Sequence, residues 1–577
     1  MDFRKYWLAQ SKLIKWSRKP KIALKQKRNN YFSWFPDGKL NIYSSCVERH
    51  LNDRTKNKVA IFFVNKDKKI NSLTYQELDS QISKFCSYLL KSVKKKRIKR
   101  VMIHASSTEW SAISMLSCAK LGIHFSVIFE DLAKEAIEKR VKIFKPEIIF
   151  SVSKNKDLSN FFSKISKANK IKIIYFYNIK LNKIKLLENP KSKSYGSDEN
   201  FFSIFTSGST GDPKGITHSY GGFLLYVVYT CKHQFGMKKN SVVLTAADAA
   251  WINGHNYSLF GPLAIGATTI LMEKPISLID ETFLKRLFKL KVSIFYLPVT
   301  LIKFMRKIFK NNKHKYRSIK ALGSMGEPLA PSVGEWFSKC FSNGKKAIVN
   351  TYYQTETGAI ICSPKFNETS KFSPHGSAGK PVNKYVKLTN LHKNKKKEIK
   401  IVNLWPGCMT NILNGYDEWK KYWDKKNNFR MFDLATVKNK NVLVHGRLDD
   451  VINVRGHRIG SEEVESIILK LKEVFECSAI SVEDELEGNI FYLFVASRSK
   501  NLNEKINNKI ISNFGVYALP KRIYYLSELP KTRSGKILRR LLRDILLNPK
   551  GNDYGDLSTI LNSEIVDEIQ YVVSKHE

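Results

Sequence analysis

A run rich in glycine and hydroxyl residues is the part of the chain best suited to chemistry. It reads Phe-Thr-Ser-Gly-Ser-Thr-Gly-Asp-Pro-Lys-Gly-Ile over residues 205–216, after a short apolar run that predicts a buried strand. Glycine lets the backbone approach a ligand, hydroxyls donate hydrogen bonds, and lysine supplies a mobile charge. The segment predicts a polyphosphate-holding loop rather than a Ser/Gly-rich surface turn, with a spacing unlike the common P-loop. The residues expected to hold phosphate are Thr206, Ser207, Gly208, Ser209, Thr210, Gly211 and Lys214.

Four further segments follow this loop along the chain. They read Gly-Ser-Met-Gly-Glu-Pro at 323–328, Asn-Thr-Tyr-Tyr-Gln-Thr-Glu-Thr-Gly at 350–358, Gly-Arg-Leu-Asp-Asp-Val-Ile-Asn-Val-Arg-Gly-His-Arg-Ile-Gly at 446–460 and Leu-Pro-Lys-Thr-Arg-Ser-Gly-Lys at 529–536. With the first segment, they resemble the ordered motifs of the adenylate-forming enzymes, which include acyl-CoA synthetases, luciferases and peptide-synthetase adenylation domains. Within that superfamily the chain is most similar to acetyl-CoA synthetase, through Trp-Ile-Asn-Gly-His-Asn-Tyr at 251–257 and Trp-Phe-Pro-Asp-Gly-Lys-Leu-Asn at 34–41.

The resemblance implies an ATP-dependent ligase that converts a short-chain, acetate-like carboxylic acid to its CoA thioester. A carboxylate attacks the α-phosphorus of ATP to give acyl-AMP and pyrophosphate, and coenzyme A then displaces AMP. ATP, Mg2+ and coenzyme A are therefore expected to bind. Two other readings stay open: adenylation with a non-CoA acceptor, and a non-catalytic protein that binds nucleotide or nucleic acid.

Lys536 is the residue that the resemblance assigns to catalysis. Carboxylate and triphosphate are both anionic, so an ammonium between them would stabilise the charge that develops in the transition state. The alternative is a solvated lysine. Acetylation of Lys536 would remove its charge and abolish this bridge, which makes it a possible point of regulation.

Glu356, flanked by Thr355 and Thr357, is expected to bind magnesium. A hard oxygen donor beside a triphosphate suits Mg2+, which keeps most of its waters. The alternative is a carboxylate that stabilises the start of a helix.

The nucleotide is expected to contact segments that lie far apart in the sequence. By resemblance, residues 326–328 face the adenine and ribose, and Tyr352 stacks on the base. Asp433 would accept from both ribose hydroxyls, because a carboxylate offers two acceptor oxygens. The family has Thr-Gly-Asp here, whereas this chain has Met-Phe-Asp at 431–433. The expected nucleotide-binding residues are Gly326, Glu327, Pro328, Asn350, Thr351, Tyr352, Tyr353, Gln354, Thr355, Asp433, Arg447 and Arg458.

The expected acyl pocket departs from the acetate branch. That branch has a Val-Thr pair after its tryptophan, a valine in the motif at 323–328 and two tryptophans before Gln-Thr-Glu-Thr. Here Asn253 and Tyr353 each add a polar group whose burial without a partner is costly. A short acid with a polar or sulfur-bearing tail therefore stays open beside plain acetate or propionate. The pocket residues are Trp251, Ile252, Asn253, Met325 and Tyr353.

Coenzyme A is expected to pass between two domains. By resemblance, Asn253, Ser277, Arg455 and Gly456 contact its pantetheine part, and Gly456 permits a close approach. Arginine at 455 is unusual for the family and suits pairing with a CoA phosphate. The family also places an arginine upstream of the catalytic lysine, where this chain has Ile511, so the CoA nucleotide is expected to be held differently.

Short apolar segments rich in β-branched or aromatic residues alternate with helical patterns, which predicts an α/β fold of mostly parallel sheets with flanking helices. The strand-like segments include 59–64, 100–104, 148–152 and 171–177, and the helical patterns include 75–90 and 110–121. A large N-terminal adenylation domain is expected at 1–446, with a cap segment at 1–60. A small, mobile α+β lid domain is expected at 447–577, hinged near Asp449.

The composition agrees with an enzyme of two or more domains. The chain has 577 residues and a formal net charge of +48. Its basic residues are spread along the length without a nucleic-acid-binding motif, so no nucleic acid is expected, although the charge would attract ATP and coenzyme A. The absence of a long apolar run argues against membrane association and, with the start of the chain, favours the cytoplasm. Eight scattered cysteines argue against a zinc site or a disulfide framework.

Overall fold

The computed structural model describes residues 2–575 with gaps. The residues outside the description are 1, 94–96, 131, 133, 187–191, 208–212, 275–277, 310–315, 343, 345, 390, 414, 449–450, 455–456, 485–487, 500, 515, 533–534, 552–553, 555–556, 558–559 and 576–577. For residues 207, 447, 451–454, 457–460, 462–463, 483–484, 488–489, 514 and 517 only the backbone is described.

The first large sheet has seven strands in the order β21-β12-β11-β7-β6-β8-β9. Its members are β6 (Arg100–His104), β7 (His124–Ile128), β8 (Ile148–Ser151), β9 (Lys172–Tyr175), β11 (Asn200–Ser207), β12 (Pro213–Ser219) and β21 (Asn411–Leu413). The strands from β11 to β9 are parallel, and β12 and β21 add an antiparallel edge. The helices between these strands are α3 (Tyr75–Ser92), α4 (Glu109–Leu121), α5 (Lys134–Phe144) and α6 (Lys156–Asn169).

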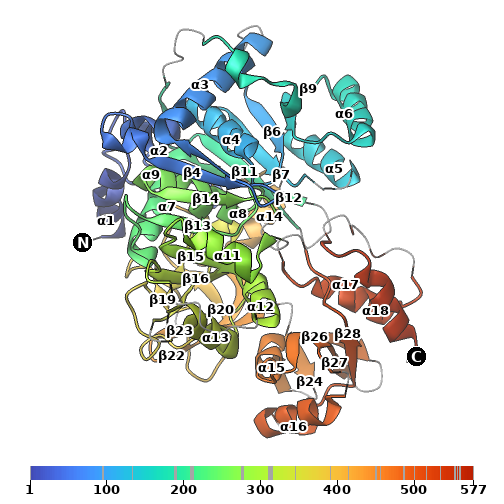
Figure 1. Ribbon diagram of the computed structural model, residues 1–577. Helices are drawn as coiled ribbons and strands as arrows, with labels where there is room; N and C mark the ends of the chain where they lie inside the picture. The colour runs from blue at the N-terminus through green and yellow to red at the C-terminus, as the bar shows by residue number, and fades with distance from the viewer. Residues whose placement is uncertain are drawn as a thin grey trace.

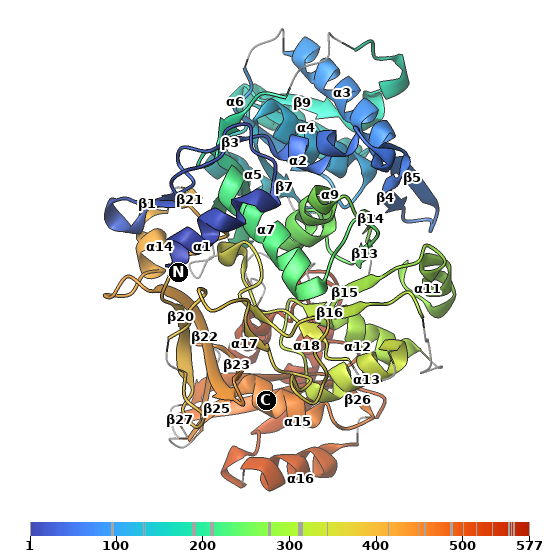
Figure 2. The same ribbon diagram turned by 90° about the vertical axis from the view of Figure 1, so that its left-hand side faces the viewer.

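The second large sheet has seven strands in the order β17-β16-β15-β13-β14-β4-β5. Its members are β4 (Val59–Val64), β5 (Ile70–Thr74), β13 (Val242–Thr245), β14 (Thr268–Met272), β15 (Ile294–Pro298), β16 (Ala321–Met325) and β17 (Val349–Asn350). All neighbours are parallel except β4 and β5. The accompanying helices are α7 (Tyr220–Phe235), α8 (Ile252–His255), α9 (Gly261–Ile265), α11 (Glu281–Phe288), α12 (Val299–Ile308) and α13 (Pro331–Ser342). Helix α7 is apolar and buried nearly all round, and it lies beside α1 in both views (Figures 1 and 2).

The N-terminal segment packs against the large part through aromatic side chains. It contains α1 (Phe3–Gln10), β1 (Leu24–Gln26), β2 (Phe32–Trp34), β3 (Lys39–Leu40) and α2 (Ile42–Cys46). Trp7 and Trp34 are buried, and the hydroxyls of Tyr6 and Tyr229 form a hydrogen bond of 2.7 Å. This segment is therefore part of the main core.

Apart from β21, the strands from residue 397 onward form smaller sheets. β20 (Lys397–Ile401), β22 (Phe429–Lys438) and β23 (Asn441–Arg447) make an antiparallel sheet, and the short helix α14 (Tyr416–Lys421) precedes β22. The C-terminal elements are β24 (Val451–Val454), β25 (His457–Gly460), α15 (Ser461–Ile468), β26 (Val474–Asp484), β27 (Gly488–Ser497), α16 (Asn503–Phe514), β28 (Arg522–Leu526), α17 (Arg539–Leu547) and α18 (Ile565–Ser574). They gather below and to the right of the large part in Figure 1, coloured orange to red.

The fold class predicted from the sequence is confirmed, and the strand and helix segments named there agree with the structure to within a few residues. The C-terminal elements pack on the second sheet, because Val464 and Leu493 belong to the same apolar cluster as Leu297 and Leu301. The boundary at 446 stays a prediction, and Asp449 lies outside the described residues.

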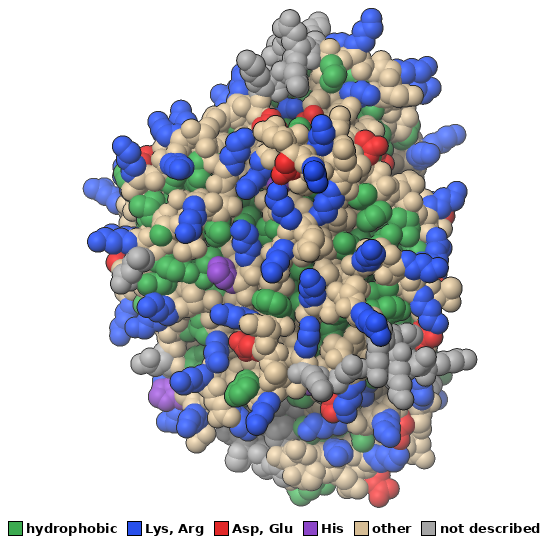
Figure 3. All heavy atoms as spheres, turned by 60° about the vertical axis from the view of Figure 1, so that its left-hand side comes forward, with side chains coloured by type: hydrophobic (Ala, Val, Ile, Leu, Met, Phe, Trp, Pro, Cys, Tyr) green, Lys and Arg blue, Asp and Glu red, His purple; other side chains and the backbone are tan. Residues whose placement is uncertain are grey.

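The surface and the cysteines agree with the compositional argument. Lys and Arg side chains are scattered over the whole visible face in Figure 3 and do not gather in one patch. All eight cysteines are buried and unpaired with one another. No helix in the described part of the chain has the length and apolar character needed to cross a membrane.

Candidate active site

The segments at 251–257, 323–328 and 350–358 lie at or beyond one edge of the second sheet. The parallel strands β13, β15, β16 and β17 end there at Thr245, Pro298, Met325 and Asn350. Pro298 pairs with Met325, and Ser324 pairs with Asn350, so the loops that follow lie side by side. Ligands of open α/β sheets bind beyond the carboxyl ends of the strands, which makes this edge the candidate site.

Glu327 anchors the motif expected to face the nucleotide. Its carboxylate lies 3.1 Å from Nζ of Lys303 in α12 and also accepts from the hydroxyl of Thr300. Burial alone would raise the pKa of Glu327, but the Lys303 ammonium, together with the Thr300 hydroxyl and the charge of Arg539, holds that pKa below its ordinary value. Beside it, Gly326 has a φ of +90°, and a Cβ there would meet no described atom within 4 Å. The side chain of Glu327 is thus held by its contacts with Lys303 and Thr300, whereas the space beside Gly326 contains no described atom.

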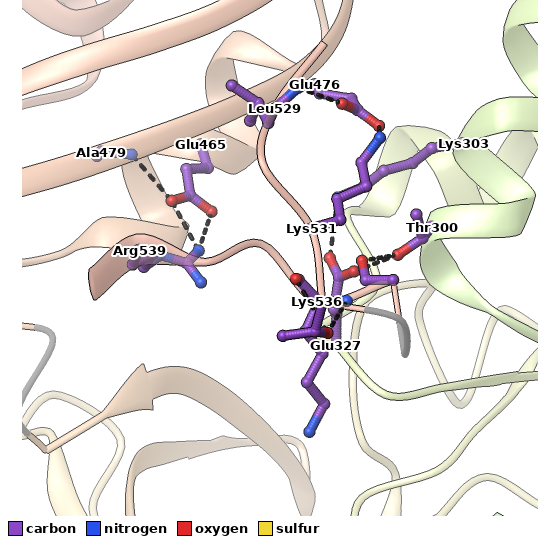
Figure 4. A network of polar contacts seen from close by, with 12 residues as sticks. Thr300, Lys303, Glu327, Glu465, Glu476, Ala479, Leu529, Lys531, Lys536 and Arg539 are labelled. Atoms are coloured by element: carbon purple, nitrogen blue, oxygen red, sulfur yellow. Dashed lines mark hydrogen bonds and ion pairs between the residues drawn. The ribbon is translucent and has the colours of Figure 1, made fainter. Parts of the chain in front are cut away.

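The C-terminal loop that carries Lys536 docks on the same threonine. The Thr300 hydroxyl lies within hydrogen-bonding distance of the Gly535 carbonyl as well as of Glu327, so two acceptors share its single proton. Gly535 has a φ of +79°, and a Cβ there would lie 2.9 Å from Oγ1 of Thr300. Lys536 is exposed, and its side chain extends away from Glu327 (Figure 4).

Two ion pairs at the ends of this loop involve the C-terminal strand β26 and helix α15 (Figure 4). Lys531 Nζ lies 2.7 Å from Glu476, and both side chains are about nine-tenths buried. Nη2 of Arg539 donates to both carboxylate oxygens of Glu465, at 2.8 and 2.7 Å. Both ends of the segment around Lys536 are therefore held by the C-terminal part, and Gly535 within it contacts Thr300 of the large part.

Asp433, the expected ribose ligand, is oriented by two neighbours. Its Oδ2 accepts hydrogen bonds of 2.7 Å from the Tyr352 hydroxyl and from Nε2 of Gln354. The preceding Phe432 has a φ of +54°, a conformation that favours glycine. Phe432 thus adopts a glycine-like conformation at the position where the family motif has glycine, and its ring lies 4.6 Å from the Arg430 guanidinium.

Asn350 and Thr351 serve the internal structure with their side chains. Asn350 accepts from Ser324 at 2.9 Å and donates to the Ser377 carbonyl at 3.0 Å. Thr351 donates to the Ser324 carbonyl at 2.9 Å. Within this segment the ring of Tyr352 is therefore the side chain best suited to stack on a base. That contact remains a prediction.

The expected acyl pocket closes with a bonded polar pair. The Tyr353 hydroxyl donates to Oδ1 of Asn253, and Nδ2 of Asn253 contacts the sulfur of Met325. Burial, with the nearby hydroxyl of Tyr296 at 3.4 Å, raises the pKa of Tyr353 well above its ordinary value, so the hydroxyl stays a donor. Ile252 and Met325, two apolar residues also expected at this pocket, are buried. Asn253 and Tyr353, the two polar residues that differ from the family pattern, are thus hydrogen-bonded to each other.

The phosphate side of the site combines Lys214, Glu356 and Tyr422. The Tyr422 hydroxyl donates a 2.7 Å hydrogen bond to Oε1 of Glu356, and its ring lies 5.8 Å from Nζ of Lys214. Glu356 lies in a short turn of helix, where the Thr355 carbonyl accepts from His218 at 2.8 Å. The lysine expected to hold phosphate and the carboxylate expected to bind magnesium therefore both contact Tyr422.

The donor set fits magnesium better than a metal held by protein alone. No group of three or more His, Cys, Asp or Glu side chains in the described ranges could hold a metal ion. Mg2+ is commonly bound by one or two carboxylates together with waters and substrate phosphates. Glu356, oriented by Tyr422, meets that requirement.

Several expected residues cannot be placed. Gly208, Ser209, Thr210, Gly211, Ser277, Arg455 and Gly456 lie outside the described residues. For Ser207, Arg447 and Arg458 only the backbone is described, at the ends of β11 and β23 and within β25. Four residues were not foreseen from the sequence, because none belongs to a motif: Thr300, Lys303, Glu418 and Tyr422.

Comparison with known proteins identifies the family. The profile of the AMP-binding enzyme family matches residues 47–400, its C-terminal domain matches 463–536, and the acetyl-coenzyme A synthetase N-terminus matches 1–46. The chain belongs to the AMP-binding enzyme family, the adenylate-forming superfamily that includes the AMP-forming acyl-CoA synthetases.

Individual relatives agree over the whole length. An acetyl-coenzyme A synthetase of Helicobacter pylori is 31% identical, with 100% of this chain and 94% of that protein covered. One from Herminiimonas arsenicoxydans is 30% identical over 99% of this chain and 93% of its own length. Among solved structures, acetoacetyl-CoA synthetase from Streptomyces lividans shares the fold with a TM-score of 0.81 at 16% identity, covering 100% of this chain and 93% of that chain. An anthranilate CoA ligase in complex with anthranoyl-AMP shares it with a TM-score of 0.76 at 19% identity, covering 88% of this chain and 97% of that chain.

Proposed function

We propose that this protein is an acid–CoA ligase that activates an acetate-like carboxylic acid through acyl-AMP. A carboxylate oxygen bonds to the α-phosphorus of ATP while the bond to the β-phosphate oxygen breaks, which releases pyrophosphate. The sulfur of coenzyme A then bonds to the carbonyl carbon, the bond to the phosphate oxygen breaks, AMP leaves, and the thiol proton passes to solvent. The acetyl-coenzyme A synthetase relatives support this reaction.

The observation that carries the proposal is the docking of the Lys536 loop at the nucleotide motif. Because Gly535 contacts Thr300, and Thr300 also faces Glu327, Lys536 follows directly at the edge where the site loops meet. In that position its ammonium would stabilise charge shared between the carboxylate and the α-phosphate. Asp433 would hold the ribose, and Mg2+ bound at Glu356 would neutralise phosphate charge.

We propose acetate, rather than an acid with a polar tail, as the substrate type. A polar tail was attractive because Asn253 and Tyr353 would need partners if buried. In the structure they bond to each other, so neither requires a group from the substrate. Ile252 and Met325 further limit the pocket to a short apolar tail.

The remaining assignments complete the proposal. The chain would divide into an adenylation domain at 1–446 and a lid at 447–577 that turns near Asp449. Coenzyme A would enter between them past Asn253, Ser277, Arg455 and Gly456. The Lys536 ammonium would be the group that acetylation switches off.

The test is thioester formation with ATP, Mg2+ and coenzyme A over acetate, propionate, hydroxypropionate and methylthiopropionate. Acetate is expected to give the highest kcat/KM. Lys536→Ala is expected to lower ATP–pyrophosphate exchange by roughly a hundredfold or more, while the exposed Lys550→Ala leaves it unchanged. AMP release without a CoA thioester would indicate another acceptor, and no AMP with any acid would contradict the proposed function.

A further inference from the structure

Helix α14 reaches the phosphate loop because of a strand pairing between distant parts of the chain. β12 carries Lys214, and its neighbour Gly215 pairs with Leu413 of β21. A Cβ on Gly215 would lie 2.8 Å from the Leu413 side chain, so the glycine permits this close approach. Since α14 begins just after β21, the pairing brings Glu418 to Lys214.

The helix is held firmly in that place. Trp419 is fully buried, its indole N–H donates to the Asn29 carbonyl at 2.9 Å, and its ring stacks on Tyr31 at 4.7 Å with an interplanar angle of 3°. Both partners belong to the N-terminal segment. The position of Glu418 is therefore fixed by the packing of the adjacent Trp419 against the N-terminal segment.

Glu418 and Lys214 form a close ion pair. Nζ of Lys214 lies 2.6 Å from Oε2 of Glu418, and the two side chains are 15% and 19% exposed. Glu418 is also paired with Lys421. Burial would raise the pKa of Glu418, but Lys214 and Lys421 outweigh this and hold that pKa below its ordinary value. The carboxylate is thus charged and largely shielded from water. In such surroundings charges interact more strongly than in bulk water, so a second anion would compete effectively for Lys214.

We propose that Glu418 is a positioning residue that holds the phosphate-loop lysine away from the triphosphate and must release it when ATP or pyrophosphate binds. This inference rests on the proposed phosphate-binding role of Lys214. A carboxylate and a phosphate group compete for one ammonium, so the ion pair weakens binding of both polyphosphates. Weak binding favours release of pyrophosphate after adenylation, which keeps the first half-reaction moving forward.

The first experiment measures binding of Mg2+–pyrophosphate to the full chain by isothermal titration calorimetry. Glu418→Gln is expected to lower the Kd by roughly threefold to tenfold, because Lys214 is no longer held by a charge-assisted partner. Asp417→Asn is the matched control: it removes the same charge from the same helix, but its carboxylate is 91% exposed and faces Lys420 at 3.5 Å. The control is expected to change the Kd by less than about twofold. An unchanged or higher Kd in Glu418→Gln overturns the inference.

A second pair of variants tests the Glu418–Lys214 contact by changing the other lysine that pairs with Glu418. Both substitutions are on the surface, so they are expected to preserve the fold. Lys421 shares Glu418 with Lys214, so Lys421→Met leaves Glu418 to Lys214 alone and is expected to raise the Kd by roughly twofold to threefold relative to Lys420→Met. Equal effects of the two substitutions contradict the inference. If the unaltered protein does not bind pyrophosphate, the proposed phosphate-binding role of the loop is wrong. If it binds but Glu418→Gln does not lower the Kd, only the inference about Glu418 is wrong.

Discussion

The hydroxyl of Thr300 in α12 faces the carbonyl of Gly535, the residue that precedes Lys536. The two residues are 235 positions apart in the sequence. Gly535 has a left-handed backbone, and a side chain there would press on the threonine. The placement of the proposed catalytic lysine therefore depends on a contact that a residue with a Cβ would disturb.

Gly535→Ala is expected to reduce ATP–pyrophosphate exchange by roughly tenfold or more. The substitution adds about 1 kcal/mol of backbone strain and a contact that forces the loop away from Thr300. Gly344→Ala is the control, since Gly344 has a φ of +78° but a Cβ there would meet only the flexible Lys339 side chain, at 3.2 Å. Gly344→Ala introduces the same backbone strain but no contact with Thr300, so its ATP–pyrophosphate exchange is expected to equal that of the unaltered protein. Equal loss in both variants would contradict the role of the Thr300 contact.

Glu327→Gln tests the buried ion pair with Lys303. The folded-state pKa of Glu327 lies below the unfolded value of about 4.3, so its contribution to stability is fully present above that value and is lost as the pH falls through the folded pKa. The variant leaves Lys303 without its partner and is expected to lower the free energy of unfolding at pH 7 by about 3 kcal/mol. Its thermal midpoint should then fall less steeply than that of the unaltered protein as the pH is lowered towards about 3.

The control for that experiment is Glu335→Gln. Glu335 pairs with Lys339 on the surface of α13, and the two side chains are 56% and 67% exposed. Surface pairs contribute little, so a change of less than about 0.5 kcal/mol is expected. A similar decrease in the free energy of unfolding in both variants would mean that the buried Lys303–Glu327 pair contributes no more to stability than a surface pair.

The sequence predicted the parts of the structure that depend on local pattern. Runs such as 59–64 and 100–104 became β4 and β6, because apolar β-branched segments of that length suit a buried parallel strand. The loops of the site could be named because they resemble family motifs. Glu418 could not be found, since it reaches Lys214 only through the pairing of β12 with β21, strands separated by about two hundred residues.

Other features depended on conformation that no residue pattern specifies. Phe432 takes a left-handed backbone, which its residue type alone argues against. Asn253 and Tyr353 were foreseen as polar groups in need of partners, but not as partners of each other. That outcome follows from the packing of a strand end against the short helix α8, which only the folded chain reveals.

Tyr422→Phe is expected to raise the Mg2+ concentration for half-maximal activity by roughly threefold to tenfold. The variant removes the hydrogen bond that orients Glu356 and leaves the ring beside Lys214 in place. Tyr416→Phe removes a hydroxyl from an exposed tyrosine at the start of α14, the helix that ends just before Tyr422, and is expected to behave like the unaltered protein. The measurement is acyl-AMP formation over a magnesium series at saturating ATP. A lower kcat with an unchanged Mg2+ requirement would contradict a role of Tyr422 in orienting the metal ligand.

Tyr353→Phe is expected to shift the choice of acid. The variant removes the donor to Oδ1 of Asn253 and leaves a buried acceptor that lacks this partner, which costs about 1–3 kcal/mol. Hydroxypropionate can supply the missing hydroxyl, whereas propionate, of equal chain length, cannot. The ratio of kcat/KM for hydroxypropionate over propionate should therefore rise by roughly fivefold or more, because a site that hydrogen-bonds a substrate hydroxyl discriminates against the analogue that lacks it. Comparison of the two acids in one variant cancels any general loss of activity. A ratio that stays the same would mean that the Tyr353–Asn253 bond does not line the pocket that receives the acid.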